Sequence, residues 1–189
     1  MDIPLEYFGA AIAWLKAQPE VDAEQVGLLG ISRGSEAALL AALTINTKIA
    51  AVVCAMPSNV VVGSWPPGSA AWTWKGKPLP HVCHHGPHAA DPLVHLPVER
   101  IDAPVLLIGA GNDAVWPSSD MATALYARRR LSVWGKRDVL LQYPNASHRS
   151  GRLVPATWEP DNPTATADAA ARRDAWPRVL KFFNDNLQR

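Results

Sequence analysis

The sequence has few cysteines and no long apolar run, and these shortages exclude several classes of protein. Its 189 residues include only two cysteines, Cys54 and Cys83, too few for a disulfide framework. No apolar run reaches the ~18 residues that a membrane-spanning helix needs. The first ten residues, MDIPLEYFGA, lack the basic and apolar regions of a signal peptide. We therefore expect a cytoplasmic protein without a membrane partner.

The chain also lacks an excess of charge of either sign. Its 18 basic and 17 acidic residues give a net charge of +1, so nothing indicates binding to nucleic acid or to an acidic membrane surface. The one basic cluster is the run 128–130. We interpret it as a solvated helix end, with a patch for ligand phosphates as the alternative.

A standard metal-binding motif is absent, although five of the six histidines lie between residues 57 and 97. The stretch HVCHHGPH contains His81, Cys83, His84, His85 and His88. Its spacing matches no common zinc pattern with a second pair of ligands, and the stretch is rich in proline and glycine. We therefore predict no metal site and no cofactor.

Residues 57–97 have no clear periodicity. They contain three of the eight tryptophans, Trp65, Trp72 and Trp74, and many of the prolines. About forty residues without a regular pattern are unusual inside a compact domain and often form a lid or a binding loop. A poorly ordered insertion is the alternative. We expect residues 1–189 to form a single domain in which 57–97 is a lid-like or binding insertion.

Short apolar runs alternate with helical patterns along the rest of the chain. Continuous hydrophobicity predicts strands that are covered on both faces, and these runs are 26–31, 49–56, 103–111 and 138–144. Helical patterns occupy residues 5–15, 36–43, 118–130 and 175–187. This order predicts an α/β fold with a mostly parallel sheet and helices on both faces.

The pentapeptide Gly30-Ile31-Ser32-Arg33-Gly34 matches the pattern G-x-S-x-G. A predicted strand precedes it and an Ala/Leu-rich helix follows it, which is the context that this motif needs. In that context a sharp turn lifts the serine oxygen out of the sheet, and the two glycines let the chain segments approach closely. We predict that Ser32 is a nucleophile and that the backbone N–H of Arg33 stabilises an oxyanion.

A nucleophilic serine needs a base, and the base needs a carboxylate that orients it. Asp113 and His148 follow the third and fourth apolar runs, where the carboxyl ends of parallel strands meet. We predict them as the carboxylate and the base, with a turn-forming aspartate and a surface-loop histidine as the alternatives. Asp102 precedes its strand and is rejected, and Asp120, in the following helix, is a weaker candidate.

A glutamate and three tryptophans are further candidates for the site. Glu36 is one helical turn beyond Ser32 and could reach the site, but we interpret it as a surface glutamate favoured by the helix dipole. Trp65, Trp72 and Trp74 are candidates for the lining of an acyl pocket, with core packing as the alternative.

Five stretches resemble, in order, the catalytic C-terminal domain of acyl-CoA thioesterases and bile acid-CoA:amino acid N-acyltransferases: IPLEYFGAAIAWLKAQPEV, VGLLGISRGSE, LPVERIDAPVLLIGAGND, YPNASH and DAWPRVLKFF. The resemblance covers nearly the whole chain, most weakly over 63–95 and 150–170. It implies an α/β-hydrolase fold and a triad that falls on Ser32, Asp113 and His148. The amino-acid-conjugating members carry cysteine at the nucleophile position, so a serine favours hydrolysis of a thioester or ester, with long-chain acyl-CoA as the substrate that the family suggests.

The comparison with this family also indicates two departures from its usual pattern. Its members have an N-terminal β-sandwich domain and further strands before the nucleophile strand, one of them followed by the loop that supplies a second oxyanion-hole amide. This chain opens at the helix before the nucleophile strand, so we expect an α/β-hydrolase fold that lacks the N-terminal strands. One edge of the nucleophile strand would then be unpaired, and we expect a homodimer or a complementing chain to cover it.

The leading prediction is a serine acyl hydrolase that acts on a small-molecule acyl thioester or ester through an acyl-enzyme. One alternative is a catalytically impaired fragment or subunit that acts by pairing through its open sheet edge. Another is an N-acyltransferase that moves an acyl group from coenzyme A to an amine.

Overall fold

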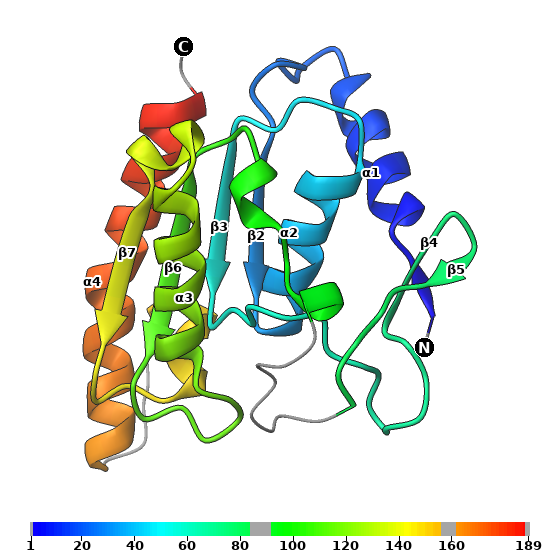
Figure 1. The fold of residues 1–189 in the computed structure, drawn as a ribbon. Helices are drawn as coiled ribbons and strands as arrows, with labels where there is room; N and C mark the ends of the chain where they lie inside the picture. The colour runs from blue at the N-terminus through cyan, green and yellow to red at the C-terminus, as the bar shows by residue number, and fades with distance from the viewer. Residues whose placement is uncertain (1, 84–91, 156–161, 188–189) are drawn as a thin grey trace.

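A four-stranded sheet forms the centre of the molecule (Figure 1). The computed structural model describes residues 2–83, 92–155 and 162–187. The strands are β2 (Gly27–Ile31), β3 (Ala51–Ala55), β6 (Val105–Ala110) and β7 (Val139–Tyr143), in that spatial order. All neighbours pair in parallel, so the four carboxyl ends meet at one edge. The predicted α/β fold is confirmed, and each strand lies within its predicted range.

Helices α1 (Glu6–Lys16), α2 (Arg33–Thr44), α3 (Ser118–Arg130) and α4 (Pro163–Leu187) surround the sheet. Helix α4 begins well before the predicted start at residue 175. Its first part could not be predicted from the sequence because that part is rich in Ala and Thr and has no apolar periodicity. Its start is fixed by Pro163 in the first position and by the Asn162 side chain, which accepts the N–H of Ala165 at 2.9 Å. None of the helices in the described part of the chain is long and apolar enough to cross a membrane.

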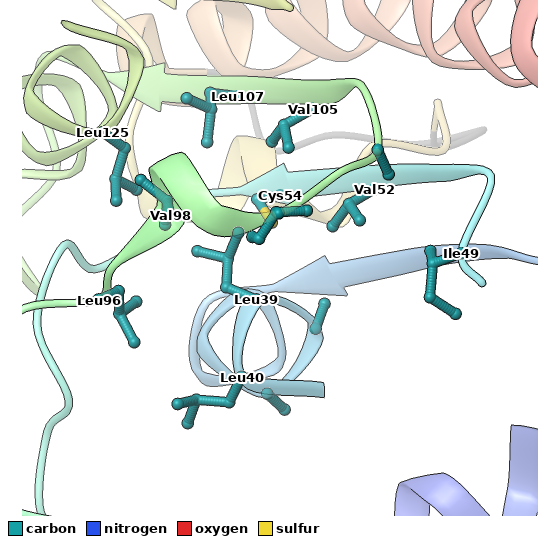
Figure 2. Packing of buried hydrophobic residues seen from close by; sticks show 14 of the residues in the cluster. Leu39, Leu40, Ile49, Val52, Cys54, Leu96, Val98, Val105, Leu107 and Leu125 are labelled. Carbon is teal, nitrogen blue, oxygen red and sulfur yellow. The ribbon is translucent and has the colours of Figure 1, made fainter. Parts of the chain in front are cut away.

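The two faces of the sheet are covered by different helices, because successive strand residues alternate between them. One face contacts α2 and α3, and its cluster includes Leu39, Val52, Cys54, Val105, Leu107 and Leu125 (Figure 2). The opposite face contacts α4, and its cluster includes Val53, Ala55, Leu106, Ile108, Val179 and Phe182. In β3 and β6, where every residue is buried, the continuous hydrophobicity reflects burial on both sides. The edge strands β2 and β7 are only partly buried, so for them the expectation of cover on both faces was wrong.

The segment 57–97 returns to the start of the chain. Its strands β4 (Trp72–Trp74) and β5 (Lys77–Pro78) form a small sheet with β1 (Ile3–Pro4), in the order β1-β4-β5. The short 3-10 helices η1 (Pro92–Val94) and η2 (Val98–Arg100) lead from it towards β6. The role of this segment as a lid or binding insertion stays a prediction, and its residues 84–91 lie outside the described part of the chain.

The basic run at the end of α3 is not uniformly solvated, so the sequence interpretation was wrong for its middle residue. Arg129 is fully buried, and its Nε and Nη2 donate to the two carboxylate oxygens of Asp138 at 2.6 and 2.9 Å. The same guanidinium donates to the carbonyl oxygens of Val98, Ile101 and Ala103. Arg129 thereby joins α3 to the chain that enters β6 and to the start of β7.

Replacement of Arg129 with methionine should lower the free energy of unfolding by about 3–5 kcal/mol, because it leaves the buried Asp138 carboxylate without its partner. Urea denaturation followed by circular dichroism measures this loss. Arg128→Met is the matched control: its ion pair with Glu99 is partly exposed, so its loss costs at most about 1 kcal/mol. Equal losses in the two variants would contradict the role given to Arg129.

Candidate active site

Ser32 lies in a sharp turn between β2 and α2. Its φ of 56° and ψ of −122° are a sparsely populated conformation for a residue with a side chain. The backbone N–H of Ser32 donates to Ala55 at 2.8 Å, which extends the β2–β3 pairing up to the serine. The Oγ of Ser35 lies 2.9 Å from the carbonyl oxygen of Gly30 and 2.7 Å from that of Ala55. These bonds hold the strained turn in place.

Close approach within this turn requires glycine at one of the two motif positions. A Cβ on Gly30 would lie 2.1 Å from the carbonyl oxygen of Gly34, a distance that no side chain tolerates. A Cβ on Gly34 would meet no described atom within 4 Å. The expectation of close approach is therefore confirmed for Gly30 and wrong for Gly34.

The pair Gly30→Ala and Gly34→Ala tests this difference. The first should lower the free energy of unfolding by about 1–3 kcal/mol or more, because backbone has to move to admit the methyl group. The second should change stability by less than about 1 kcal/mol, because the methyl group enters open space and alanine favours the helix. Thermal and urea denaturation of the two variants give the comparison, and a destabilised Gly34→Ala beside an unaffected Gly30→Ala would contradict it.

The structure brings Ser32, His148 and Asp113 into one hydrogen-bonded chain. His148 Nε2 lies 2.8 Å from Ser32 Oγ, and His148 Nδ1 lies 2.7 Å from Asp113 Oδ2. The other oxygen of Asp113 accepts the backbone N–H groups of Val115 at 2.9 Å and Trp116 at 3.3 Å. The Asp113 side chain is buried, whereas that of His148 is 19% exposed. This is the arrangement that a serine, a base and an orienting carboxylate require.

The electrostatics of Asp113 suit an orienting role. Burial by itself would raise the pKa of Asp113, but hydrogen bonds from His148, Ser118 and Val115 outweigh it and hold the pKa below its ordinary value. The carboxylate therefore stays ionised at neutral pH and accepts the Nδ1–H of His148. That hydrogen bond leaves Nε2 as the nitrogen that can accept a proton from Ser32.

Two residues that sequence reasoning missed hold His148 in place. Asp168 of α4 is buried and accepts the backbone N–H and the hydroxyl of Ser147 at 2.6 and 2.7 Å. Trp116 packs edge to face against the imidazole, with ring centroids 5.3 Å apart, and donates its indole N–H to the Met56 carbonyl. Neither role has a local sequence signal, since both depend on contacts between distant segments.

A cavity of about 250 Å³ lies beside the serine, and its lining is Ser32, Arg33, Val62, Gly63, Ser64, Trp65, Cys83, Val115 and Trp116. Of the three tryptophans predicted to line an acyl pocket, only Trp65 is among these described residues. Trp72 is buried and donates its indole N–H to Glu36, and Trp74 packs against the core. Trp72 and Trp74 thus lie in or against the core, as the alternative interpretation expected, and Trp72 also lines a separate apolar groove beside α1.

The sequence interpretation of Glu36 as a surface residue was wrong. Its side chain is fully buried, and Oε1 accepts the indole N–H of Trp72 at 2.5 Å and the backbone N–H of Val62 at 3.1 Å. Oε2 lies 3.5 Å from Nη1 of Arg33. Burial raises the pKa of Glu36 to about 7, although Arg33, Trp72 and Val62 all act to lower it. The chain that covers this glutamate comes from residues 57–74, which the local sequence around Glu36 could not reveal.

Arg33 is the first residue of α2, where a backbone N–H has no acceptor within the helix. The oxyanion role predicted for this N–H is therefore compatible with its place in the fold. Of the histidine-rich stretch, His84, His85 and His88 lie outside the described residues. Within residues 2–83, 92–155 and 162–187, no three His, Cys, Asp or Glu side chains are grouped as a metal would need.

Comparison with known proteins identifies relatives along most of the chain. The family model described as "BAAT / Acyl-CoA thioester hydrolase C terminal" matches residues 3–66 and 81–150. The chain is 30% identical over 220 residues to acyl-coenzyme A thioesterase 1 of Homo sapiens and 32% identical over 212 residues to the mitochondrial acyl-coenzyme A thioesterase 2 of Rattus norvegicus. Each match covers 97% of this chain but only 49% and 45% of the relative. The chain thus spans about half the length of these relatives.

Solved structures share the fold at low sequence identity. The structure of DcsB in complex with its substrate analogue has a TM-score of 0.61 at 13% identity, covering 97% of this chain and 71% of that one. Carboxyl esterase 2 from Tuber melanosporum has a TM-score of 0.59 at 14% identity, covering 94% and 60%. These likenesses show the α/β-hydrolase fold alone. The family-model match extends over more than half of the residues, and by it the chain belongs to the BAAT / acyl-CoA thioester hydrolase C-terminal family.

Proposed function

We propose that the chain is a serine acyl hydrolase that cleaves an acyl thioester or ester. The observation that supports the proposal best is the continuous hydrogen-bonded chain from Ser32 Oγ through His148 to Asp113, placed at a strained strand-to-helix turn. The matched relatives are named acyl-coenzyme A thioesterases, which favours a thioester of coenzyme A as the substrate.

The reaction follows from this geometry. Ser32 Oγ attacks the acyl carbonyl carbon while His148 Nε2 takes the hydroxyl proton, and the backbone N–H of Arg33 stabilises the oxyanion. The tetrahedral intermediate collapses, the thiol or alcohol leaves with the proton from His148, and an acyl-serine remains. His148 then removes a proton from water, which attacks the acyl-serine and releases the acid. Asp113 orients the imidazole throughout.

Reaction with a fluorophosphonate, read by intact mass, tests whether Ser32 is activated. One adduct should form on the wild-type protein and none on Ser32→Ala, and hydrolysis of acyl-coenzyme A by the variant should fall on the order of 10⁴-fold or more. The variant should keep the wild-type melting temperature, since the hydroxyl is not part of the core. An unlabelled wild-type protein, or a variant that still hydrolyses the thioester at the wild-type rate, would contradict the proposal.

The same assay separates hydrolysis from transfer. With an amine such as glycine added at increasing concentration, the product of the wild-type protein should remain the free acid, because the reaction that we propose ends with the attack of water on the acyl-serine. An amide product that rises with amine concentration would favour the N-acyltransferase alternative instead.

A specific observation favours a second function, pairing through the sheet edge. Strand β2 is an edge strand of the described sheet, and Leu29, its middle residue, is 44% exposed. An apolar groove of about 400 Å³ runs beside it, lined in part by Phe8, Ile12 and Leu15 of α1. We propose that a second copy of the chain covers this edge, because antiparallel pairing of two β2 strands about Leu29 is self-complementary.

Light scattering coupled to size-exclusion chromatography tests this pairing. The wild-type protein should elute with the mass of a dimer, and Leu29→Lys should elute as a monomer because it places a charge at the centre of the paired edge. Leu131→Lys, which changes a leucine that is 89% exposed at the end of α3, is the matched control and should remain dimeric. A monomeric wild-type protein would overturn the pairing.

A further inference from the structure

We propose that Glu36 is a positioning residue for hydrolysis: its buried carboxylate fixes the Arg33 guanidinium and the Val62 wall of the cavity beside Ser32. The inference rests on the proposed hydrolase function and adds a residue to it. Glu36 itself is not among the described residues that line the cavity, so it acts through its neighbours.

The contacts of Glu36 join three separate parts of the chain. Oε1 accepts hydrogen bonds from the Trp72 indole of β4 and from the backbone N–H of Val62. Oε2 faces Nη1 of Arg33 at 3.5 Å, and this nitrogen donates to the Val62 carbonyl oxygen at 2.5 Å. Glu36 and Arg33 therefore hold the N–H and the C=O of the same residue. The result is a closed clamp on the cavity wall at Val62.

This clamp contains a carboxylate oxygen that stability alone does not explain. Glu36 Oε2 is buried and has no hydrogen-bond partner in the described part of the chain, where its separation from Arg33 is longer than a good hydrogen bond. Burial of such a charge is costly, and an apolar residue of similar volume is often at least as stable in its place. What the carboxylate supplies here is a negative charge beside Arg33.

The Arg33 guanidinium is the feature of the site that this charge controls. Its side chain is 32% exposed, and among the described residues that line the cavity it is the one that carries a full charge. Without the carboxylate, Nη1 keeps its hydrogen bond to the Val62 carbonyl oxygen but loses the negative charge beside it. The cation and the cavity wall would then shift relative to Ser32, and a misplacement of about 1 Å at a reacting centre can cost about 10²-fold in rate.

The clamp is sensitive to pH in the neutral range. Burial raises the pKa of Glu36 to about 7, so the ionised carboxylate that attracts Arg33 gives way to a neutral carboxyl as the pH falls below 7. Arg33 is the charged group that faces Glu36, while Val62 and Trp72 face it with an amide and an indole.

The other elements packed against α2 add little charge. Strands β2 and β3 contain no charged residue. The 3-10 helix η2 carries Glu99, which pairs with Arg128, and Arg100. Among these elements, Arg33 is therefore the charged group that acts directly on the pKa of Glu36.

The proposal is tested by the ratio of kcat/KM of the wild type to kcat/KM of Glu36→Gln, measured as a function of pH. Glutamine resembles the protonated carboxyl, so the ratio should be close to one at about pH 5.5 and should rise about 10- to 100-fold by about pH 8.5. A ratio of one at every pH would overturn the proposal, and so would a constant loss accompanied by a lower melting temperature, which is the sign of a merely structural role.

Arg33→Met provides a second route, because its partly exposed side chain can be replaced even if Glu36→Gln does not fold. It should lose the same factor in kcat/KM at high pH, and the double variant should lose no more than the worse single variant, because both residues act as one unit. An Arg33→Met protein with wild-type kinetics at every pH would overturn the proposal.

Glu99→Gln is the matched control: it removes a carboxylate from a partly exposed ion pair with Arg128 and should give a ratio of one throughout. Fluorophosphonate labelling distinguishes a failure of the role proposed for Glu36 from a failure of the proposed hydrolase function. A labelled wild type with a flat ratio refutes the role of Glu36 and leaves the hydrolase intact. An unlabelled wild type refutes the hydrolase itself.

Discussion

The close approach of Gly30 to the first turn of α2 is the constraint on which the site depends. At 2.1 Å from the Gly34 carbonyl oxygen there is no room for a side chain, so β2 can turn directly into α2 with Ser32 at its apex. A conformation of this kind costs roughly 1–3 kcal/mol, which the bonds from Ser35 and the β2–β3 pairing offset. Asp113 and His148 reach the serine because β6 and β7 run parallel to β2 and end at the same edge of the sheet.

Buried charges elsewhere in the molecule act on loops rather than on the core. Arg129 binds the carbonyl groups that lead into β6, Glu36 binds the backbone of Val62, and Asp168 binds Ser147. In each case a charged side chain binds main-chain groups that lie outside the named strands and the α-helices. The apolar clusters on the two faces of the sheet stabilise the fold. Glu36 and Asp168 fix segments near the site, whereas Arg129 fixes the segments that enter β6 and β7 at the opposite edge of the sheet.

The parts that could be predicted from sequence are those with a local signal. Continuous apolar runs predicted the four strands, and the place of Asp113 and His148 after two of them predicted which residues would meet Ser32. Charged side chains were placed at the surface because that is where most of them lie. Arg129 and Glu36 contradict this expectation, since distant segments cover them. The first half of α4 escaped prediction because alanine and threonine show no apolar face there.

The anchoring of Ser147 by Asp168 couples the loop before His148 to helix α4. The Asp168 carboxylate accepts both the backbone N–H and the hydroxyl of Ser147, the residue next to His148. A change that shifts α4 along the sheet would therefore move His148 relative to Ser32, although α4 contributes no residue to the described lining of the cavity beside the serine.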